Sequence, residues 1–286
     1  MASPSSLAAS LPAGVRPVSL VTGGARRIGR EIALHLARHG HDLALHCRQW
    51  GDEAEVTAAE LRALGAQVTV LQAELADEAE CRALVPDAVA RLGRLDAVVN
   101  NASLFEYDDA TTASTALMAS HWAANTAAPV LLAQALAAHV NERAATETAA
   151  TGCVVNLLDQ KLWNPNPDYF SYTLSKAALR EATVLLAQAL APRVRVVGVA
   201  PGVTLLSGPM TEAELAQASR MTPLQRSSSP ADIARAVLFL IESPAITGTT
   251  LLVDGGQHLS AQPRDVLFLA RAQGATAALP LSSSQS

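Results

Sequence analysis

A tyrosine and a lysine four positions apart are the first residues of this sequence that could carry chemistry. Tyr172 and Lys176 lie in a stretch with helical periodicity, and side chains four apart on a helix share one face. An ammonium beside a phenol favours the phenolate, so it makes the phenol a stronger acid near neutral pH. The pair is therefore a candidate proton donor, whose alternative is an ordinary solvated surface pair.

A glycine-rich segment supplies a second candidate site. Residues 22–29 read Thr-Gly-Gly-Ala-Arg-Arg-Ile-Gly and stand between a short apolar run and a helical pattern. In such a turn, Gly23 and Gly29 carry no side chain, so backbone N–H groups can approach a pyrophosphate closely. The N-terminus of the following helix favours the negative charge of that group. The segment predicts a dinucleotide site, and a plain tight turn is the alternative.

The end of the second predicted strand indicates which dinucleotide is bound. A ribose 2′-hydroxyl is usually held by an acidic residue there, whereas a 2′-phosphate requires a cation. Arg48 offers a planar guanidinium suited to phosphate, and Arg26 adds charge from the glycine loop. NADP(H) is therefore predicted over NAD(H), unless Arg48 is only a solvated loop charge. Glu74 and Leu75 are candidates for the adenine pocket, with a surface carboxylate as the alternative for Glu74.

Strand and helix patterns alternate along most of the chain, which predicts a single Rossmann-type α/β domain. We expect a doubly wound, seven-stranded parallel sheet flanked by helices. The predicted strands are 18–21, 42–46, 67–71, 95–99, 153–158, 194–199 and 250–253. The predicted helices include 52–64, 77–92, 112–124, 125–143, 170–190, 211–220 and 231–241, after a first one that Gly40 ends.

Three regions follow from this pattern. Residues 1–16 are predicted to be a flexible lead-in, residues 17–260 the NADP(H)-binding domain, and residues 261–286 a C-terminal extension. The apolar run Val266–Leu269 is not expected to stay exposed, so we expect it to pack on a neighbouring subunit, while the end of the extension is predicted to be disordered.

Composition excludes several classes of protein. Half of the 286 residues are hydrophobic and 16% are charged, which is enough for a sizeable core. The net charge of −5 without a basic cluster argues against a nucleic-acid partner. Cys47, Cys81 and Cys153 share no metal-ligand spacing, which predicts buried thiols and no metal. Apolar runs too short for a membrane span and the absence of a signal peptide predict a cytoplasmic protein with no membrane partner.

With these pieces assembled, the sequence resembles the short-chain dehydrogenase/reductase family from about residue 17 to residue 259. The shared motifs are a Thr-Gly turn with a later glycine, Asn-Asn-Ala after the fourth strand, an asparagine in the next long helix, Tyr-x-x-x-Lys, and Pro-Gly after the sixth strand. They correspond here to Thr22, Gly23, Gly29, Asn100, Asn101, Ala102, Asn125, Tyr172, Lys176, Pro201 and Gly202.

Three departures from that pattern resemble its pteridine reductase branch, which includes bacterial dihydromonapterin reductases. Arg27 replaces the middle glycine, Ser103 replaces the glycine of Asn-Asn-Ala-Gly, and Asp159 stands where the family has serine. Phe105 matches the ring that in this branch sandwiches the pterin against the nicotinamide, although a core aromatic is the alternative.

The resemblance implies a mechanism. NADPH would deliver hydride to a C=N carbon of a pterin, Tyr172 would supply the proton, and Lys176 would hold the nicotinamide ribose and lower the phenol pKa. Asp159 would orient the pterin or relay the proton, since an acceptor-only carboxylate suits an aminopyrimidine. Asn125 would hold a water chain leading to Lys176. A loop cap and a helix N-cap are the alternatives for Asp159 and Asn125.

The resemblance also assigns site residues. The predicted cofactor-binding residues are Gly23, Arg26, Arg27, Ile28, Gly29, Arg48, Glu74, Leu75, Asn101, Ala102, Ser103, Tyr172, Lys176, Pro201 and Gly202. The predicted substrate-binding residues are Arg27, Ser103, Phe105, Asp159, Tyr172 and Leu205, the last in a loop, 205–210, that resembles the family's substrate lid. A homotetramer is implied as well.

Two other functions remain open at this point. One keeps the fold and the cofactor but reduces a carbonyl, as 3-oxoacyl carrier-protein or quinone reductases do, and the serine such enzymes normally need is absent at Asp159. The other is a non-catalytic NADP(H)-binding protein, which would have no use for the Tyr172 and Lys176 pair.

Overall fold

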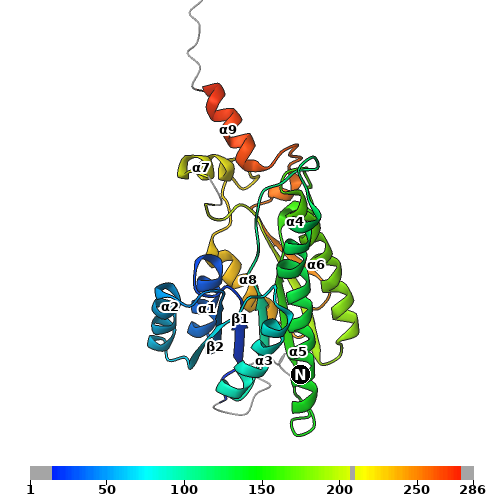
Figure 1. Cartoon of the computed structure of the whole chain (residues 1–286). Helices are drawn as coiled ribbons and strands as arrows, with labels where there is room; N and C mark the ends of the chain where they lie inside the picture. Colours follow the sequence, from blue (N-terminus) through cyan, green and yellow to red (C-terminus); the bar gives the residue numbers. More distant parts are fainter. Residues whose placement is uncertain (1–14, 207–209, 278–286) are drawn as a thin grey trace, which may run out of the picture.

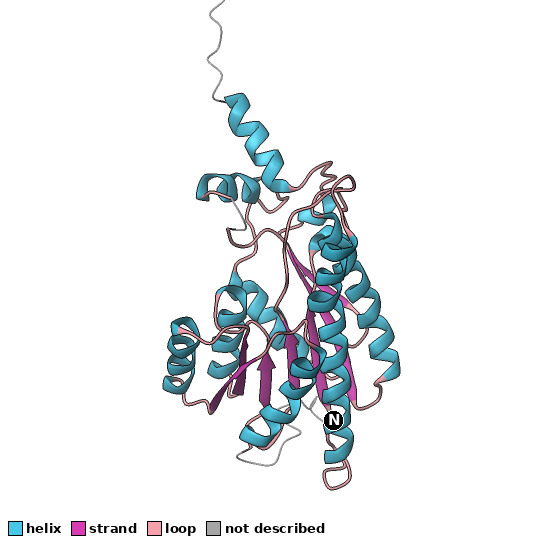
Figure 2. Ribbon diagram, in the orientation of Figure 1, coloured by secondary structure: helices cyan, strands magenta, loops and turns pink. Residues whose placement is uncertain are grey.

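A seven-stranded parallel sheet forms the centre of the protein, with helices on both faces (Figures 1 and 2). The computed structural model describes residues 15–206 and 210–277. The strand order is β3-β2-β1-β4-β5-β6-β7, and every neighbouring pair is parallel. The strands are β1 (Val18–Val21), β2 (Asp42–Cys47), β3 (Val68–Gln72), β4 (Ala97–Asn100), β5 (Gly152–Leu157), β6 (Val194–Pro201) and β7 (Thr250–Val253). This confirms the predicted fold.

The helices form two layers because each face of the sheet is apolar. Helices α1 (Arg27–Arg38), α2 (Asp52–Ala63) and α8 (Pro230–Glu242) cover one face. Helices α3 (Glu78–Leu92), α5 (Ala128–Arg143) and α6 (Phe170–Ala189) cover the other. Figure 1 shows α4 (Thr115–Trp122) continuing the line of α5, with α7 (Glu212–Arg220) and α9 (Val266–Ala277) beyond the upper end of the sheet.

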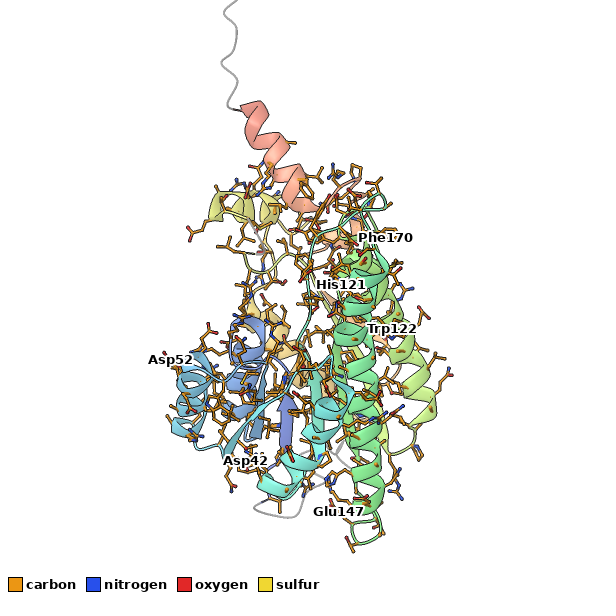
Figure 3. All side chains as sticks on the ribbon, in the orientation of Figure 1. Asp42, Asp52, His121, Trp122, Glu147 and Phe170 are labelled. Carbon is orange, nitrogen blue, oxygen red and sulfur yellow. The ribbon has the colours of Figure 1, made fainter. Side chains whose placement is uncertain are left out.

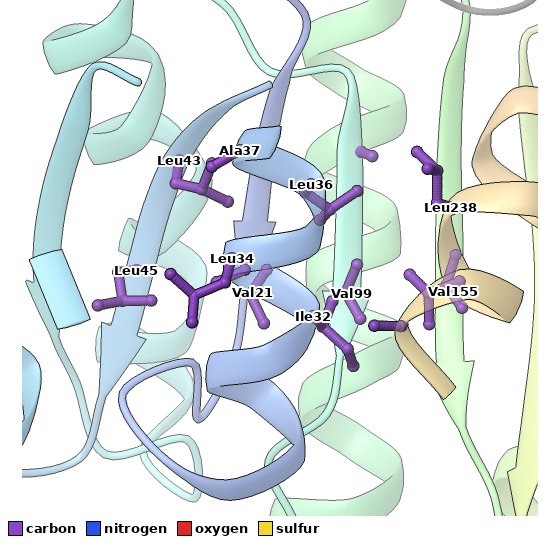
Figure 4. Close-up of a cluster of buried hydrophobic side chains, with 14 of the residues drawn as sticks. Val21, Ile32, Leu34, Leu36, Ala37, Leu43, Leu45, Val99, Val155 and Leu238 are labelled. Atoms are coloured by element: carbon purple, nitrogen blue, oxygen red, sulfur yellow. The ribbon is translucent and has the colours of Figure 1, made fainter. Parts of the chain in front are cut away.

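Alternating strand residues build the two cores. Val21, Val99 and Val155 point to the side of α1 and α8, where Figure 4 shows them with Ile32 and Leu238. The residues one position earlier, Leu20, Val98 and Val154, belong to the cluster on the opposite face. Because strands covered on both faces need apolar residues at every position, they read as short continuous apolar runs, which is why the sequence pattern located them.

The long helix before β5 is one element and not the two that were predicted. Residues 123–127 form a π-helical segment between α4 and α5, and the backbone stays helical through it. By length and mean hydropathy this helix, Thr115–Arg143, could cross a membrane, but half of its apolar window is buried in the protein. Leu132 and Leu136 lie fully buried against the sheet, so the apolar face is explained by the core. The prediction failed because Asn125 resembles a helix N-cap in sequence.

Both ends of the domain differ from the predicted boundaries. Arg16, placed in the lead-in, is anchored by a hydrogen bond from Nε to Asp42 Oδ1 at 2.8 Å. The C-terminal extension contains α9, whose Val266 and Leu267 are buried against Met210 and Ala218 of the same chain. Burial within the chain thus replaces part of the predicted packing on another subunit. The predicted disordered end and lead-in fall largely on residues 1–14 and 278–286, outside the described residues.

The loops after β1 and β4 are joined at the point where the strand order reverses. Asn101 and Ala102 each donate a backbone N–H to Thr22 Oγ1 at 3.0 Å, and Asn101 Nδ2 donates to Thr22 O at 2.9 Å. Open α/β sheets bind ligands at such a switch point, outside the carboxyl ends of the strands. The two sequence motifs are therefore one structural unit, the Thr22–Asn101 clamp.

Gly29 is required by the space inside this unit. A Cβ at residue 29 would lie 2.2 Å from Gly23 O and 2.6 Å from Asn101 Nδ2. The helix would have to move away from the loop to admit it, even though alanine is the better helix former.

Replacing Gly29 with alanine should therefore destabilise the protein by roughly 1–3 kcal/mol, the usual cost of overpacking. Urea unfolding would measure this change. Gly51→Ala is the control, because nothing lies within 4 Å of the added Cβ, and we expect it to stay within about 0.5 kcal/mol of wild type. Equal stabilities for the two variants would contradict the close approach.

Candidate active site

A cavity of about 230 Å³ opens at the carboxyl ends of β4, β5 and β6. The loop after β1, the turn after β5, α6 and the C-terminal segment contribute its other walls. It brings together these predicted site residues: Arg27, Ile28, Asn101, Ser103, Phe105, Asp159, Tyr172, Lys176, Pro201, Gly202 and Leu205. The predicted residues outside its lining are Gly23, Arg26, Gly29, Arg48, Glu74, Leu75, Ala102 and Asn125.

Asp159 and Tyr172 form the central polar contact of the cavity. The Tyr172 hydroxyl donates to Asp159 Oδ2 at 2.9 Å, and the backbone N–H of Lys161 donates to Asp159 Oδ1 at 2.8 Å. Asp159 follows β5 and caps the 3₁₀ turn Gln160–Leu162, while Tyr172 lies in the first turn of α6. Asp159 thus caps this turn, which was the alternative to a functional role, and it also contacts Tyr172 in the cavity, while its role in substrate orientation or proton relay stays a prediction. Each carboxylate oxygen keeps a further lone pair for a ligand.

Burial sets the protonation of this pair. Burial raises the pKa of Asp159, and the hydrogen bonds from Lys161 and Tyr172 oppose that shift. Burial, followed by the neighbouring Asp159 carboxylate, raises the pKa of Tyr172 well above its ordinary value. Tyr172 therefore stays a neutral phenol near neutral pH, where it can give up a proton only to a group that becomes basic during a reaction.

Contrary to the sequence prediction, Lys176 does not lower the pKa of the Tyr172 phenol. Its ammonium donates to Leu157 O at 2.7 Å and lies 5.9 Å from the Tyr172 ring centre. Burial lowers the pKa of Lys176 to about 8, and Asp159 opposes the shift. The predicted lowering of the phenol pKa by Lys176 is absent here, because burial and Asp159 dominate the phenol.

Asn125 organises the wall of the cavity through its side chain. Its Oδ1 accepts from Leu104 N at 2.7 Å and from Ser103 Oγ at 3.2 Å, and its Nδ2 donates to Leu104 O and to Ser175 Oγ. Two acceptor sites and two donors of the amide are thereby used by protein groups. Ser103 is turned toward Asn125 by the same contacts. The predicted water chain at Asn125 remains a prediction.

Phe105 is not a core aromatic, since 40% of the residue is exposed. Its ring stacks on Tyr169 with centres 4.3 Å apart and meets the edge of Tyr172 at 4.7 Å. Tyr169 therefore covers one face of the Phe105 ring, and the contact with Tyr172 places Phe105 beside the Asp159–Tyr172 pair. Tyr169 takes a φ of 53° before α6, a strained conformation for a bulky residue that tends to occur at functional sites.

Arg27 occupies a backbone position that favours glycine. Its φ is 53°, so the side chain is kept at a cost of about 1–3 kcal/mol of backbone strain. Its guanidinium reaches across the cavity mouth and donates to Leu206 O at 2.6 Å. Arg27 thereby links the glycine loop to the loop after β6. Residues 207–209 of the predicted lid lie outside the described residues.

The first turn of α1 fits an anion. It has no acidic residue, and no side chain caps its N-terminal N–H groups, so these donors and the helix dipole are available to a phosphate. Arg48 is exposed at the end of β2, and Arg26 is exposed within 3.8 Å of Glu53.

Leu75 and Glu74 occupy different environments. Leu75 is buried in the hydrophobic cluster under α3, which favours a packing role over the predicted adenine contact. Glu74 is exposed beside it, so it remains a candidate.

The Pro201–Gly202 turn is fixed by the loop after β7. A Cβ on Gly202 would lie 2.8 Å from Asp254, which explains the glycine. Gln257 Oε1 accepts the N–H of Val203 at 3.0 Å and so holds the next residue. The predicted site residues after β6 thus depend on β7, a support that no sequence motif indicated.

The turn after β5 and the C-terminal segment form a polar wall of the cavity that no sequence motif indicated. Lys161 is buried, with its ammonium 3.8 Å from Asp265 Oδ2, and it also donates to Asp168 O. Burial lowers the pKa of Lys161 and raises the pKa of Asp265. Both residues line the cavity together with Gln160.

Asp168 holds the C-terminal segment in place. Its carboxylate accepts from Arg264 Nε and Nη2 at 2.8 to 3.0 Å and from Asp265 N at 2.6 Å. Burial would raise the pKa of Asp168, but the hydrogen bonds from Arg264 and Asp265 outweigh it, and the pKa is lowered. No motif marks this contact, although the apolar run after residue 265 indicated that the segment would be buried.

The helix behind Tyr172 contributes a buried histidine. Figure 3 shows His121 and Trp122 on α4 and Phe170 at the start of α6, toward the upper end of the protein. The His121 ring centre lies 6.4 Å from that of Tyr172, and its Nε2 accepts from Glu106 N at 3.4 Å. His121 thus supports the loop that carries Phe105.

Known proteins resemble this chain over most of its length. Residues 23–258 match the family model described as Enoyl-(Acyl carrier protein) reductase. The chain is 35% identical over 257 residues to the granaticin polyketide synthase putative ketoacyl reductase 2 of Streptomyces violaceoruber, covering 85% of this chain and 96% of that protein. It is 33% identical over 281 residues to pteridine reductase 1 of Leishmania tarentolae, covering 85% and 97%.

A solved structure resembles the whole domain. FolM alternative dihydrofolate reductase 1 from Brucella canis, complexed with NADP, has a TM-score of 0.80 and 42% sequence identity to this chain. The match covers 87% of this chain and 96% of that one.

The lowered pKa of Lys176 predicts a pH dependence of stability without ligands. The unfolded chain keeps the lysine proton up to about 10.5, whereas the folded protein releases it near 8. The unfolded state therefore binds more protons between these values, and folding becomes more favourable as the pH rises. Relative to Lys176→Met, wild type should gain roughly 2–3 kcal/mol in urea unfolding between about pH 7 and pH 10. A constant difference would show that Lys176 titrates normally.

Proposed function

Because this chain belongs to the short-chain dehydrogenase/reductase family, we propose that it is an NADPH-dependent pterin reductase. The reaction transfers hydride to a C=N bond of a dihydropterin or dihydrofolate-type substrate. The Asp159–Tyr172 hydrogen bond carries the proposal. It places an acceptor-only carboxylate and a neutral phenol side by side in the cavity, where carbonyl reductases of the family use a serine hydroxyl.

The relatives support the cofactor and the substrate class. The Brucella canis structure holds NADP, and its name and that of the Leishmania relative refer to dihydrofolate and pteridine reduction. In this chain the uncapped N-terminus of α1 suits the pyrophosphate and Arg48 suits the 2′-phosphate. When bound, NADPH supplies the hydride.

The residues of the chain then have separate tasks. Tyr172, held neutral by its raised pKa, supplies the proton that the substrate nitrogen needs as it becomes basic. Asp159 accepts N–H donors of the heterocycle with its free lone pairs, and its bond to Tyr172 makes it the group through which the phenol can be reprotonated. Phe105, half exposed in the cavity wall, is assigned to stack on the heterocycle, and Ser103, Arg27 and Leu205 complete the substrate wall.

Lys176 is assigned to the nicotinamide ribose. Its ammonium is already turned to the cavity edge by Leu157 O, and its lowered pKa makes it sensitive to an added hydrogen-bond partner. We further propose a cytoplasmic homotetramer, on the family resemblance.

A carbonyl reductase is the competing function, because the Streptomyces relative bears the name of a putative ketoacyl reductase. The aspartate at residue 159 argues against it. A carboxylate beside a ketone oxygen would repel the negative charge that develops there during hydride transfer.

Purified protein should oxidise NADPH in the presence of 7,8-dihydropterins. Tyr172→Phe should lower kcat by roughly 10²- to 10⁴-fold, the usual contribution of a general acid, while NADPH binding persists. Asp159→Ser should lower kcat/KM for the dihydropterin by roughly 5- to 100-fold and affect ketone reduction less. Steady-state kinetics and NADPH fluorescence titration would measure these changes.

A substrate panel decides between the two activities. Turnover of ketones with none of any pterin would replace the pterin proposal by carbonyl reduction. NADPH binding without turnover of either class would leave only a dinucleotide-binding protein.

The role of Arg48 is tested by charge reversal. Arg48→Asp should raise the KM for NADPH by roughly tenfold or more, because it removes a charge-assisted phosphate contact, and should leave the KM for NADH nearly unchanged. Arg62→Asp, which changes an equally exposed arginine on α2, controls for net charge. Equal effects of Arg48→Asp on both cofactors would contradict the phosphate contact.

A further inference from the structure

His46 joins the ends of three neighbouring strands through its side chain. The residue lies near the end of β2 and is 1% exposed. Its Nδ1 lies 3.1 Å from the backbone nitrogen of Gly23, in the loop after β1, and its Nε2 lies 3.1 Å from Ala73 O, just after β3. The imidazole therefore connects the glycine loop to the chain after β3.

These two contacts fix the protonation of the imidazole. A backbone N–H only donates and a carbonyl oxygen only accepts, so Nδ1 must keep its lone pair for Gly23 and Nε2 must carry the proton that goes to Ala73 O. Burial lowers the pKa of His46, while the Ala73 carbonyl and the Glu74 carboxylate oppose the shift. His46 is therefore neutral near pH 7, and a protein group uses each of its nitrogens.

The glycine loop is supported from two sides. The Thr22–Asn101 clamp ties it to β4, and His46 ties it to β2 and β3. The backbone of β2 adds a further bond, from Gly24 N to His46 O at 3.0 Å. Between the two supports, Gly23 has a φ of 61°, a conformation that glycine adopts readily but does not prefer over others. External contacts must therefore select it.

We propose that His46 is a positioning residue for the dinucleotide, which holds the glycine loop in the conformation that receives the pyrophosphate. It acts through the N–H of Gly23. A loop that is already ordered loses less conformational freedom when the cofactor binds, so binding is tighter. This inference rests on the dinucleotide binding of the proposed function and is independent of the substrate class.

The role of His46 differs from that of Arg48 in one measurable respect. Arg48 is assigned to the 2′-phosphate, which only NADP(H) carries. The glycine loop receives the pyrophosphate, which NADP(H) and NAD(H) share. Loss of the His46 contact should therefore weaken the binding of both dinucleotides by the same factor.

Three substitutions at residue 46 of the full chain test the proposal. His46→Leu removes both nitrogens and should raise the Kd of NADP+ and of NAD+ roughly 5- to 50-fold, because the N–H of Gly23 loses its acceptor. In asparagine the amide oxygen can stand where Nδ1 stands, so His46→Asn should bind both dinucleotides within about threefold of wild type. His46→Gln carries its amide one bond further out, at the level of Nε2, and should bind as weakly as His46→Leu. Isothermal titration calorimetry would measure each Kd.

His41→Leu is the matched control. His41 is equally buried, and it directly precedes the same strand at the opposite edge of the sheet, where its Nδ1 lies 2.8 Å from Ser19 Oγ. Both leucine variants lose a buried hydrogen-bonded imidazole, so both should be less stable in urea. Only His46→Leu should lose affinity for the dinucleotides. If His46→Leu does not fold, the comparison of His46→Asn with His46→Gln decides the matter, because both keep a polar side chain.

Several results would overturn the role of His46. Wild-type affinity in His46→Gln would do so, as would a His46→Asn variant that binds as weakly as His46→Gln. A loss confined to NADP+ would assign the effect to the 2′-phosphate and not to the loop. If wild type binds no dinucleotide, the proposed function fails as well. If wild type binds NADP+ and all the variants bind it equally, only the role of His46 is wrong.

Discussion

The candidate site depends on holding a carboxyl group, a phenol and an ammonium close together with little water. Asp159, Tyr172 and Lys176 each lose hydration at the carboxyl edge of the sheet, and burial is the largest influence on the pKa of all three. Removing a charge from water costs several kcal/mol unless partners replace the lost hydrogen bonds. The backbone supplies most of these partners, through Lys161 N and Leu157 O. The geometry of β5 and α6 therefore sets which of these three groups carry a proton.

The sequence was most informative about groups that face the sheet or take part in a motif. The seven strands were predicted because doubly covered parallel strands must be apolar throughout, and the lining of the cavity contains all six predicted substrate-binding residues. The actual pKa of Tyr172 could not be predicted, because spacing gives the distance to Lys176 along a helix but not the hydration of either group. The π-helical segment at Asn125 also leaves no local signal, and the contacts of Asn125 there are with Ser103 and Leu104, some 20 residues earlier.

Residues contributed by tertiary contacts alone were invisible to motif analysis. Gln160, Lys161 and Asp265 belong to no recognisable pattern, and they meet only because Asp168 anchors the C-terminal segment beside the turn after β5. The apolar run at Val266 correctly indicated burial, yet hydrophobicity carries no information about which surface covers it. The same holds for Arg27, whose departure from glycine is visible in sequence but whose contact with Leu206 O is not.

One wall of the cavity comes from the last described helix, after every strand of the sheet has been made. A chain that terminates early, before residue 264, would keep the layers that the sheet needs for folding but would lack the partner of Asp168. The segment that closes this side of the site therefore lies outside the sheet, and a nonsense codon just before residue 264 would spare the scaffold while removing the wall.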